Sequence, residues 1–136
     1  MKYPLTALAS LSAVLLAGTA ASQEAAKAPP SVKEVMITAT VPASDAIFAA
    51  AYEPPTQAAQ WVALRASAKA LADSGRVLAT TERANDAEWI VMARALVTQA
   101  EATFKAIDKK DADALSRAGD EVFLTCKTCH DRFKTE

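Results

Sequence analysis

The chain has 136 residues, with 15 basic and 16 acidic side chains and a formal net charge of −1 at pH 7. Proteins that bind nucleic acid present a basic face, so this balance argues against a nucleic-acid partner. Hydrophobic residues make up 51% of the chain, which has only three glycines, two cysteines and one histidine. An alanine-rich chain with few glycines and no alternating strand pattern has a helical composition, and its length fits one small domain.

The N-terminus has the pattern of a secretory signal peptide. Lys2 provides a positive charge, an apolar run follows from Leu5 to Ala17, and small residues at 18–22 offer a cleavage site. We therefore predict a signal peptide over residues 1–21 and export to the periplasm, with an uncleaved N-terminal anchor as the alternative. The apolar run is short for a membrane helix and no second one follows, so we expect no membrane span in the mature protein. Residues 22–30 are predicted to be a mobile lead, and residues 31–136 to form the domain.

Two helices are predicted in the first half of the domain. The first begins at Ser31, which matches a capping box with the acid three residues later, and it ends before Pro54–Pro55. Pro42 should kink or split this helix, because proline lacks the N–H of a helical hydrogen bond. The second helix starts near Thr56 and should loosen or end at Gly75. Apolar residues recur at helical spacing along the two segments: Val32, Val35, Met36, Ala39, Ala43, Ile47 and Ala50, then Trp61, Leu64, Ala68 and Leu71.

Two more helices are predicted in the second half. The third begins with Asn85 as its N-cap, followed by acids in the first turn, where the helix dipole favours them. A polar turn at 108–111 separates it from the fourth, which opens at Asp111 or Asp113. Their apolar positions are Trp89, Ala93, Leu96, Ala100, Phe104 and Ile107, then Leu115, Ala118, Val122, Cys129 and Phe133. Short connections make neighbouring amphipathic helices antiparallel, so we predict an all-α, up-down-up-down antiparallel four-helix bundle.

The fourth helix carries a CxxCH motif, Cys126-Lys127-Thr128-Cys129-His130, which contains both cysteines and the only histidine. CxxCH is the attachment signature of a c-type haem. The two thiolates can add across the vinyl groups of the porphyrin, and the histidine can ligate the iron. On a helix these three side chains lie on one side. We therefore predict one covalently bound haem c, whose flat apolar macrocycle would fill a core that has few large side chains.

Three other uses of the motif compete with haem attachment. A zinc site would need a fourth ligand, such as Asp131. A thioredoxin-like CxxC motif is expected in a βαβ context at the start of a helix, which differs from the helical sequence seen here. Two cysteines three positions apart on a helix fit the geometry of a disulfide poorly.

Met36 is the predicted distal ligand. In the predicted topology the fourth helix ends at the level where the first begins. His130 lies about 9 Å of helix rise before the C-terminal residue, and Met36 about 7.5 Å after Ser31, so the two lie at similar height. Methionine sulfur is a usual axial partner of histidine in electron-transfer haems. The alternatives are a core methionine that fills an irregular gap, and Met92, near the start of the third helix, as the ligand.

With these features the chain resembles the class II c-type cytochromes, the cytochrome c-prime and cytochrome c556 group. The likeness rests on an exported precursor, four helices, and a CxxCH motif on the last helix that is followed by Phe133-Lys134. It covers the whole domain, from about Ser31 to Glu136. Placement of the motif on the last helix is its most specific part, since class I cytochromes carry the motif near the start.

The resemblance implies the roles of individual residues. Cys126 and Cys129 would form the thioether bonds, and His130 would be the proximal ligand. Low-spin members of the family use a methionine early in the first helix, which Met36 matches. The c-prime members lack that ligand and leave the iron five-coordinate, open to nitric oxide or carbon monoxide. Pro42 departs from the family pattern and could move the distal side.

We therefore expect a periplasmic electron-transfer protein with a His/Met-ligated low-spin haem, and not an enzyme. The alternative is a five-coordinate, c-prime-like protein that binds nitric oxide or carbon monoxide. A peroxidase ranks lower, because the sole histidine is already the proximal ligand, and a thiol oxidoreductase using both cysteines is a further alternative. The sequence does not identify the redox partner protein. Antiparallel dimers in the resembling family leave a homodimer open.

Overall fold

The computed structural model describes residues 28–134, so the predicted signal peptide and most of the predicted lead lie outside it. Within this range every element is a helix, which confirms the predicted all-α class. In chain order they are α1 (Val32–Val35), the π-helical segment η1 (Met36–Thr40), α2 (Val41–Tyr52), α3 (Ala58–Leu78), α4 (Ala87–Lys109) and α5 (Ala112–Phe133).

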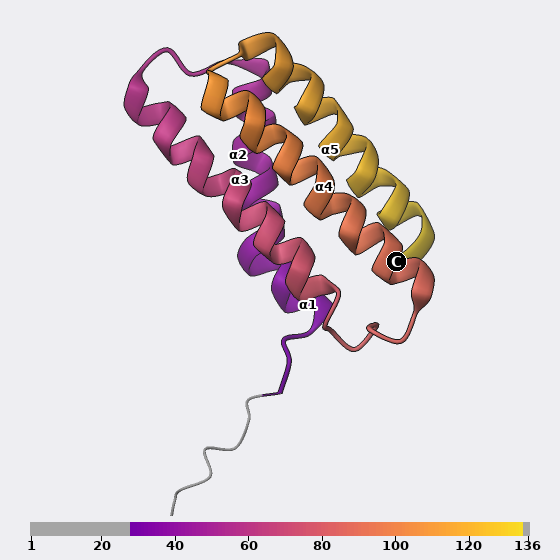
Figure 1. Ribbon diagram of the computed structural model, residues 1–136. Helices are drawn as coiled ribbons and strands as arrows, with labels where there is room; N and C mark the ends of the chain where they lie inside the picture. Colours follow the sequence, from indigo (N-terminus) through magenta and orange to yellow (C-terminus); the bar gives the residue numbers. More distant parts are fainter. Residues whose placement is uncertain (1–27, 135–136) are drawn as a thin grey trace, which may run out of the picture.

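The described helices form a bundle of four rods, the first of which is the continuous run of α1, η1 and α2. Successive rods run in opposite directions, as Figure 1 shows. α2 contacts α3 and α5, and α4 contacts the same two helices. The predicted antiparallel arrangement is therefore the one seen. Its core is filled by apolar side chains from all four rods, among them the fully buried Ile47, Leu71, Leu115 and Val122.

The first rod changes its backbone hydrogen bonding just before Pro42. The N–H of Val41 donates to the carbonyl of Met36, five residues back, where an α-helix would use a spacing of four. Pro42 lies in the first turn of α2, and its ring and missing N–H disturb the bonding of the preceding turn. Pro42 was predicted to kink or split the helix, but the helical run continues through it. The effect seen is a π-helical segment directly before the proline. The wider spacing buries Val35 and Thr40 together, although they lie five positions apart.

The start of α1 is fixed by two side chains. Ser31 Oγ accepts a hydrogen bond from the N–H of Glu34 at 3.2 Å, which is one of the two bonds of the predicted capping box. The second side chain comes from the loop between α3 and α4. Both carboxylate oxygens of Glu82 lie 3.2 Å from the N–H of Val32, which donates to them. This contact therefore links the start of the first rod to the α3–α4 loop.

Asn85 was a wrong choice of cap for α4. Asp86 is the N-cap, and its Oδ1 accepts from the N–H groups of Glu88 and Trp89 at 3.0 and 3.1 Å. A carboxylate so placed also interacts favourably with the helix dipole. At the other end of α4, Lys110 takes the left-handed conformation, and the chain then turns into α5. The predicted polar turn is confirmed.

Gly75 does not end the second helix, contrary to the prediction. α3 begins at Ala58 and continues through Gly75 to Leu78. A Cβ atom on Gly75 would lie 2.8 Å from Cγ2 of Val97 and 3.2 Å from the carbonyl oxygen of Ala93, both on α4. The glycine is therefore explained by the close approach of two helix backbones, and not by a helix end.

The helical run Val32–Tyr52 is long and apolar enough to cross a membrane, judged by its length and its mean hydropathy of 1.4 alone. Among the described residues it is the one run that meets this criterion. In the bundle this run packs against α3 and α5, and it buries Ala43 and Ile47. The buried core helix of a soluble protein and a signal sequence both meet the same criterion, and 28% of the apolar window is buried here.

Candidate functional site

A cavity of ≈ 410 Å³ opens between the first rod, α4 and α5, at the end of the bundle that holds the α3–α4 loop. This volume lies in the range of small-molecule and cofactor sites. Its walls are mostly apolar, with Phe48, Leu96 and Phe123 among the lining side chains. All four predicted site residues line it: Met36, Cys126, Cys129 and His130.

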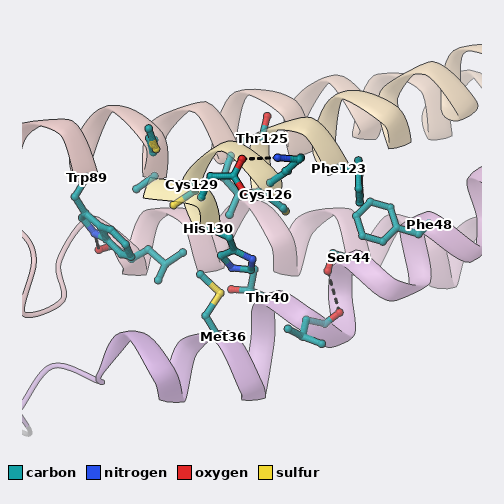
Figure 2. A pocket seen from close by; sticks show the side chains of 17 residues that line it. Met36, Thr40, Ser44, Phe48, Trp89, Phe123, Thr125, Cys126, Cys129 and His130 are labelled. Carbon is teal, nitrogen blue, oxygen red and sulfur yellow. Dashed lines mark hydrogen bonds and ion pairs between the residues drawn. The ribbon is translucent and has the colours of Figure 1, made fainter. Parts of the chain in front are cut away.

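Met36 and His130 approach the cavity from opposite walls. Met36 is the first residue of η1, and His130 lies near the end of α5. Their side chains point toward one another in Figure 2. Met36 is half-buried and packs against the core, whereas His130 is exposed. The structure therefore brings together the two residues that the sequence predicted as axial ligands.

Cys126 and Cys129 lie on the α5 wall as free, half-buried thiols. Burial raises the pKa of the Cys126 thiol, and the neighbouring Cys129 adds to the increase. Burial also raises the pKa of Cys129, while the positive charge of Arg83 opposes the change. Both groups are therefore neutral thiols at pH 7, and no disulfide joins them.

The hydroxyl groups and the Lys127–Asp131 pair of the cavity wall are already engaged inside the protein. Thr40 Oγ1 donates to the carbonyl of Val35 at 3.4 Å, and Ser44 Oγ donates to the carbonyl of Val41 at 3.0 Å. On the α5 wall the ammonium group of Lys127 pairs with Asp131, one turn away.

The structure does not favour the zinc alternative. Asp131 is engaged with Lys127 on the same helix. Across residues 28–134, no group of three or more His, Cys, Asp or Glu side chains is arranged to hold a metal ion.

A second cavity of ≈ 690 Å³ adjoins the first, and sequence reasoning did not predict it. The two cavities share Met36, Val41, Trp89 and His130 as lining residues. The second has a charged rim made of Lys33, Glu82, Arg83 and Lys134. The thiols line the first cavity, and the two predicted axial ligands stand where the cavities meet.

Trp89 organises the boundary between the cavities. Its indole N–H donates to the carbonyl of Leu78 at 2.8 Å, which joins the start of α4 to the end of α3. Its ring makes an edge contact with Phe133, at 5.2 Å between centroids. The guanidinium carbon of Arg83 lies 5.3 Å from the Trp89 ring centre and 4.9 Å from that of Phe133. The sequence placed both aromatic residues on inward stripes but gave no reason to single out Arg83.

Met92 also lines the first cavity, from α4. It is half-buried, as is Met36. Met36 borders both cavities, whereas Met92 borders only the first. The position at the junction therefore distinguishes Met36 from its rival.

Comparisons with known proteins assign the chain to no family: no family model, curated protein or solved structure matches it. The functional argument therefore rests on the motif and on the arrangement of the two cavities.

Proposed function

We propose that the protein is a c-type cytochrome that carries electrons through one covalently attached haem. Cys126 and Cys129 would hold the haem, and His130 and Met36 would be its axial ligands. The proposal includes export to the periplasm, membership of the class II cytochromes on their low-spin c556 branch, and the absence of catalysis. The observation that carries it is the convergence of all four residues on one apolar cavity.

The chemistry of the cavity lining fits a haem. A haem has vinyl groups at one edge, propionates at the opposite edge, and iron at the centre. The cysteine thiols, which would bond to the vinyl groups, border the first cavity alone. Met36 and His130 border both cavities, between which the centre of a group spanning them would lie. Apolar walls suit the macrocycle, and the hydroxyl groups on them are already paired.

The side chains would each have a defined task. A bound haem supplies a one-electron couple whose potential depends on the axial ligands and on burial. The His130 imidazole would ligate from α5, and the Met36 thioether from η1. Met36 would also keep small exogenous ligands away from the metal. The apolar lining would exclude water, which favours a stable potential.

Two alternatives differ from this proposal in a single feature. A gas-binding protein of the c-prime type requires Met36 to be absent from the metal. A thiol oxidoreductase requires reactive thiolates, which occur where the pKa is lowered. Because burial raises the pKa of both cysteines, the second alternative is disfavoured.

Absorption spectra of the purified protein test the proposal. We expect low-spin ferric and ferrous spectra that carbon monoxide does not change. We also expect the haem to stay with the protein during acid–acetone extraction, because thioether bonds survive it. Extraction of the haem would refute covalent attachment. A high-spin ferric form that binds carbon monoxide readily would support the c-prime alternative instead.

A pair of matched variants assigns the distal ligand. Met36→Ala should convert the protein from low spin to high spin and allow carbon monoxide to bind. Met92→Ala removes the same side chain from the same cavity and should leave the low-spin spectrum intact. The reverse result would identify Met92 as the ligand, and a native protein that is already high-spin would show that neither methionine binds.

A further inference from the structure

We propose that Arg83 binds a propionate of the haem and so fixes which edge of the group enters the second cavity. This inference rests on the proposed function and adds an anionic subsite to it. The sequence contains several cationic side chains that could bind a propionate, and the fold shows which of them lie at the cavities.

The charges around the two cavities differ. The rim of the second cavity has three cations and one carboxylate: Lys33, Arg83, Lys134 and Glu82. Both oxygens of the carboxylate already accept the N–H of Val32 at the start of α1. In the first cavity, the charged residues Lys127 and Asp131 pair with each other. The second cavity, which the thiols do not line, therefore favours an anionic edge such as the propionates of a haem, although the charge of Arg83 also acts on Cys129.

Arg83 is held in place more firmly than the lysines of the rim. Its guanidinium group lies over the rings of Trp89 and Phe133, at 5.3 and 4.9 Å. Arg83 is half-buried, whereas Lys33 and Lys134 are exposed. Stacking on aromatic rings limits the positions of the guanidinium, so less conformational entropy is lost when a carboxylate binds. The planar fork of arginine also matches a carboxylate in a bidentate manner.

The donors of Arg83 are not consumed by its acidic neighbour. The nearest carboxylate oxygen, Oδ2 of Asp86, lies at 3.8 Å, which is longer than a hydrogen bond. The other oxygen of Asp86 accepts the N–H groups of Glu88 and Trp89 as the cap of α4. Asp86 therefore keeps the guanidinium near the cavity without saturating it.

One further ion pair lies close to this group. Arg132 of α5 also approaches the Phe133 ring, at 5.6 Å. Its Nε, however, donates to both carboxylate oxygens of Glu88, at 3.0 and 2.9 Å. Arg132 is thus already bound to a carboxylate of the protein, so of the two arginines near the Phe133 ring Arg83 is the one available to the cavity.

The test uses the haem-loaded protein and the variants Arg83→Gln and Arg94→Gln. Arg94 lies on the exposed side of α4, so its substitution makes the same change of charge away from both cavities. The propionate bending mode in the resonance Raman spectrum reports hydrogen bonding to the propionate. We expect this mode to shift in Arg83→Gln and to stay at the native frequency in Arg94→Gln. The midpoint potential should decrease in Arg83→Gln, because a nearby cation favours the ferrous state. The potential of Arg83→Lys should lie between those of the native protein and Arg83→Gln.

The outcomes separate this inference from the proposed function. Covalent haem with native ligation but an unchanged bending mode in Arg83→Gln would overturn the role of Arg83 and leave the function standing. Absence of covalent haem from the native protein would overturn both. If Arg83→Gln does not fold, exchange of the Arg83 Nε–H with water in the native protein decides the question by nuclear magnetic resonance. We expect it to be slower than that of Arg94, and equal rates would refute the contact.

Discussion

Substitution of Gly75 by alanine tests how closely α3 and α4 pack. The new Cβ would lie 2.8 Å from Cγ2 of Val97, and 3.2 and 3.3 Å from two backbone atoms of α4. The valine side chain is branched at Cβ and has few alternative rotamers in a helix. The backbone atoms can yield only if the whole helix shifts. The substitution therefore forces the two helices apart.

The expected loss of stability combines two opposing effects. Insertion of a methyl group into a packed interface costs about 1–3 kcal/mol. Alanine is better than glycine inside a helix by roughly 0.5–1 kcal/mol. The net free energy of unfolding should therefore fall by about 0–2.5 kcal/mol. A central value of about 1 kcal/mol lowers the melting temperature by roughly 4–8 °C in a domain of this size.

Urea unfolding followed by circular dichroism measures this change. The control is Ala66→Gly, at an exposed position of the same helix. It measures the effect of helix propensity alone and should lower the free energy of unfolding by about 0.5–1 kcal/mol. If Gly75→Ala instead stabilises the protein by the difference in helix propensity, then α3 and α4 do not pack as closely at this position as the structure indicates.

Three further predictions concern the caps and the thiols. Asp86→Ala should lower the unfolding free energy by about 1 kcal/mol because two N–H groups lose their acceptor. Asn85→Ala should change it by less than about 0.5 kcal/mol. Equal losses of the two variants in urea titrations would show that Asp86 is not the cap. Glu82→Gln should destabilise the protein by about 0.5–1 kcal/mol, since a neutral amide replaces the carboxylate that accepts the Val32 N–H, and unchanged stability would show that this contact is not formed in solution. In the haem-free protein, the raised pKa of Cys126 keeps its thiolate fraction at pH 8 below that of the same chain in urea. Iodoacetamide should therefore react more slowly with the folded chain, and the reaction should accelerate as the pH rises past 9. Faster reaction of the folded chain would show that the pKa of Cys126 is lowered instead.

The helical spacing of apolar residues was enough to predict the bundle. Trp61, Leu64, Leu71 and Leu115 are buried where the pattern placed them. The errors occurred where a local signal has two physical causes. A glycine near the end of a helical pattern can be a C-cap or a point of close approach, and Gly75 is the latter. Two adjacent capping residues cannot be ranked from sequence alone, because the choice depends on where the preceding loop enters.

The candidate site was predicted in part. The height argument along the bundle placed Met36 opposite His130, and the structure brings both to one cavity. The second cavity was not foreseeable, because Lys33 and Arg83 are far apart in sequence and meet only at the end of the bundle. The π-helical form of the interruption was also out of reach, since proline signals a break without specifying how the backbone absorbs it.

The packing of the bundle is uneven along its length, and this has a consequence for partial unfolding. At the end away from the cavities, Trp61, Ile107 and Leu115 are buried and close the core with side chains alone. At the cavity end, no residue of α5 from Phe123 to Phe133 is buried. Segments with few buried contacts open at a lower free energy than the rest of a protein. Whatever fills the cavities therefore supports the C-terminal turns of α5, and its removal should expose this segment to proteases and hydrogen exchange while the opposite end of the bundle stays folded.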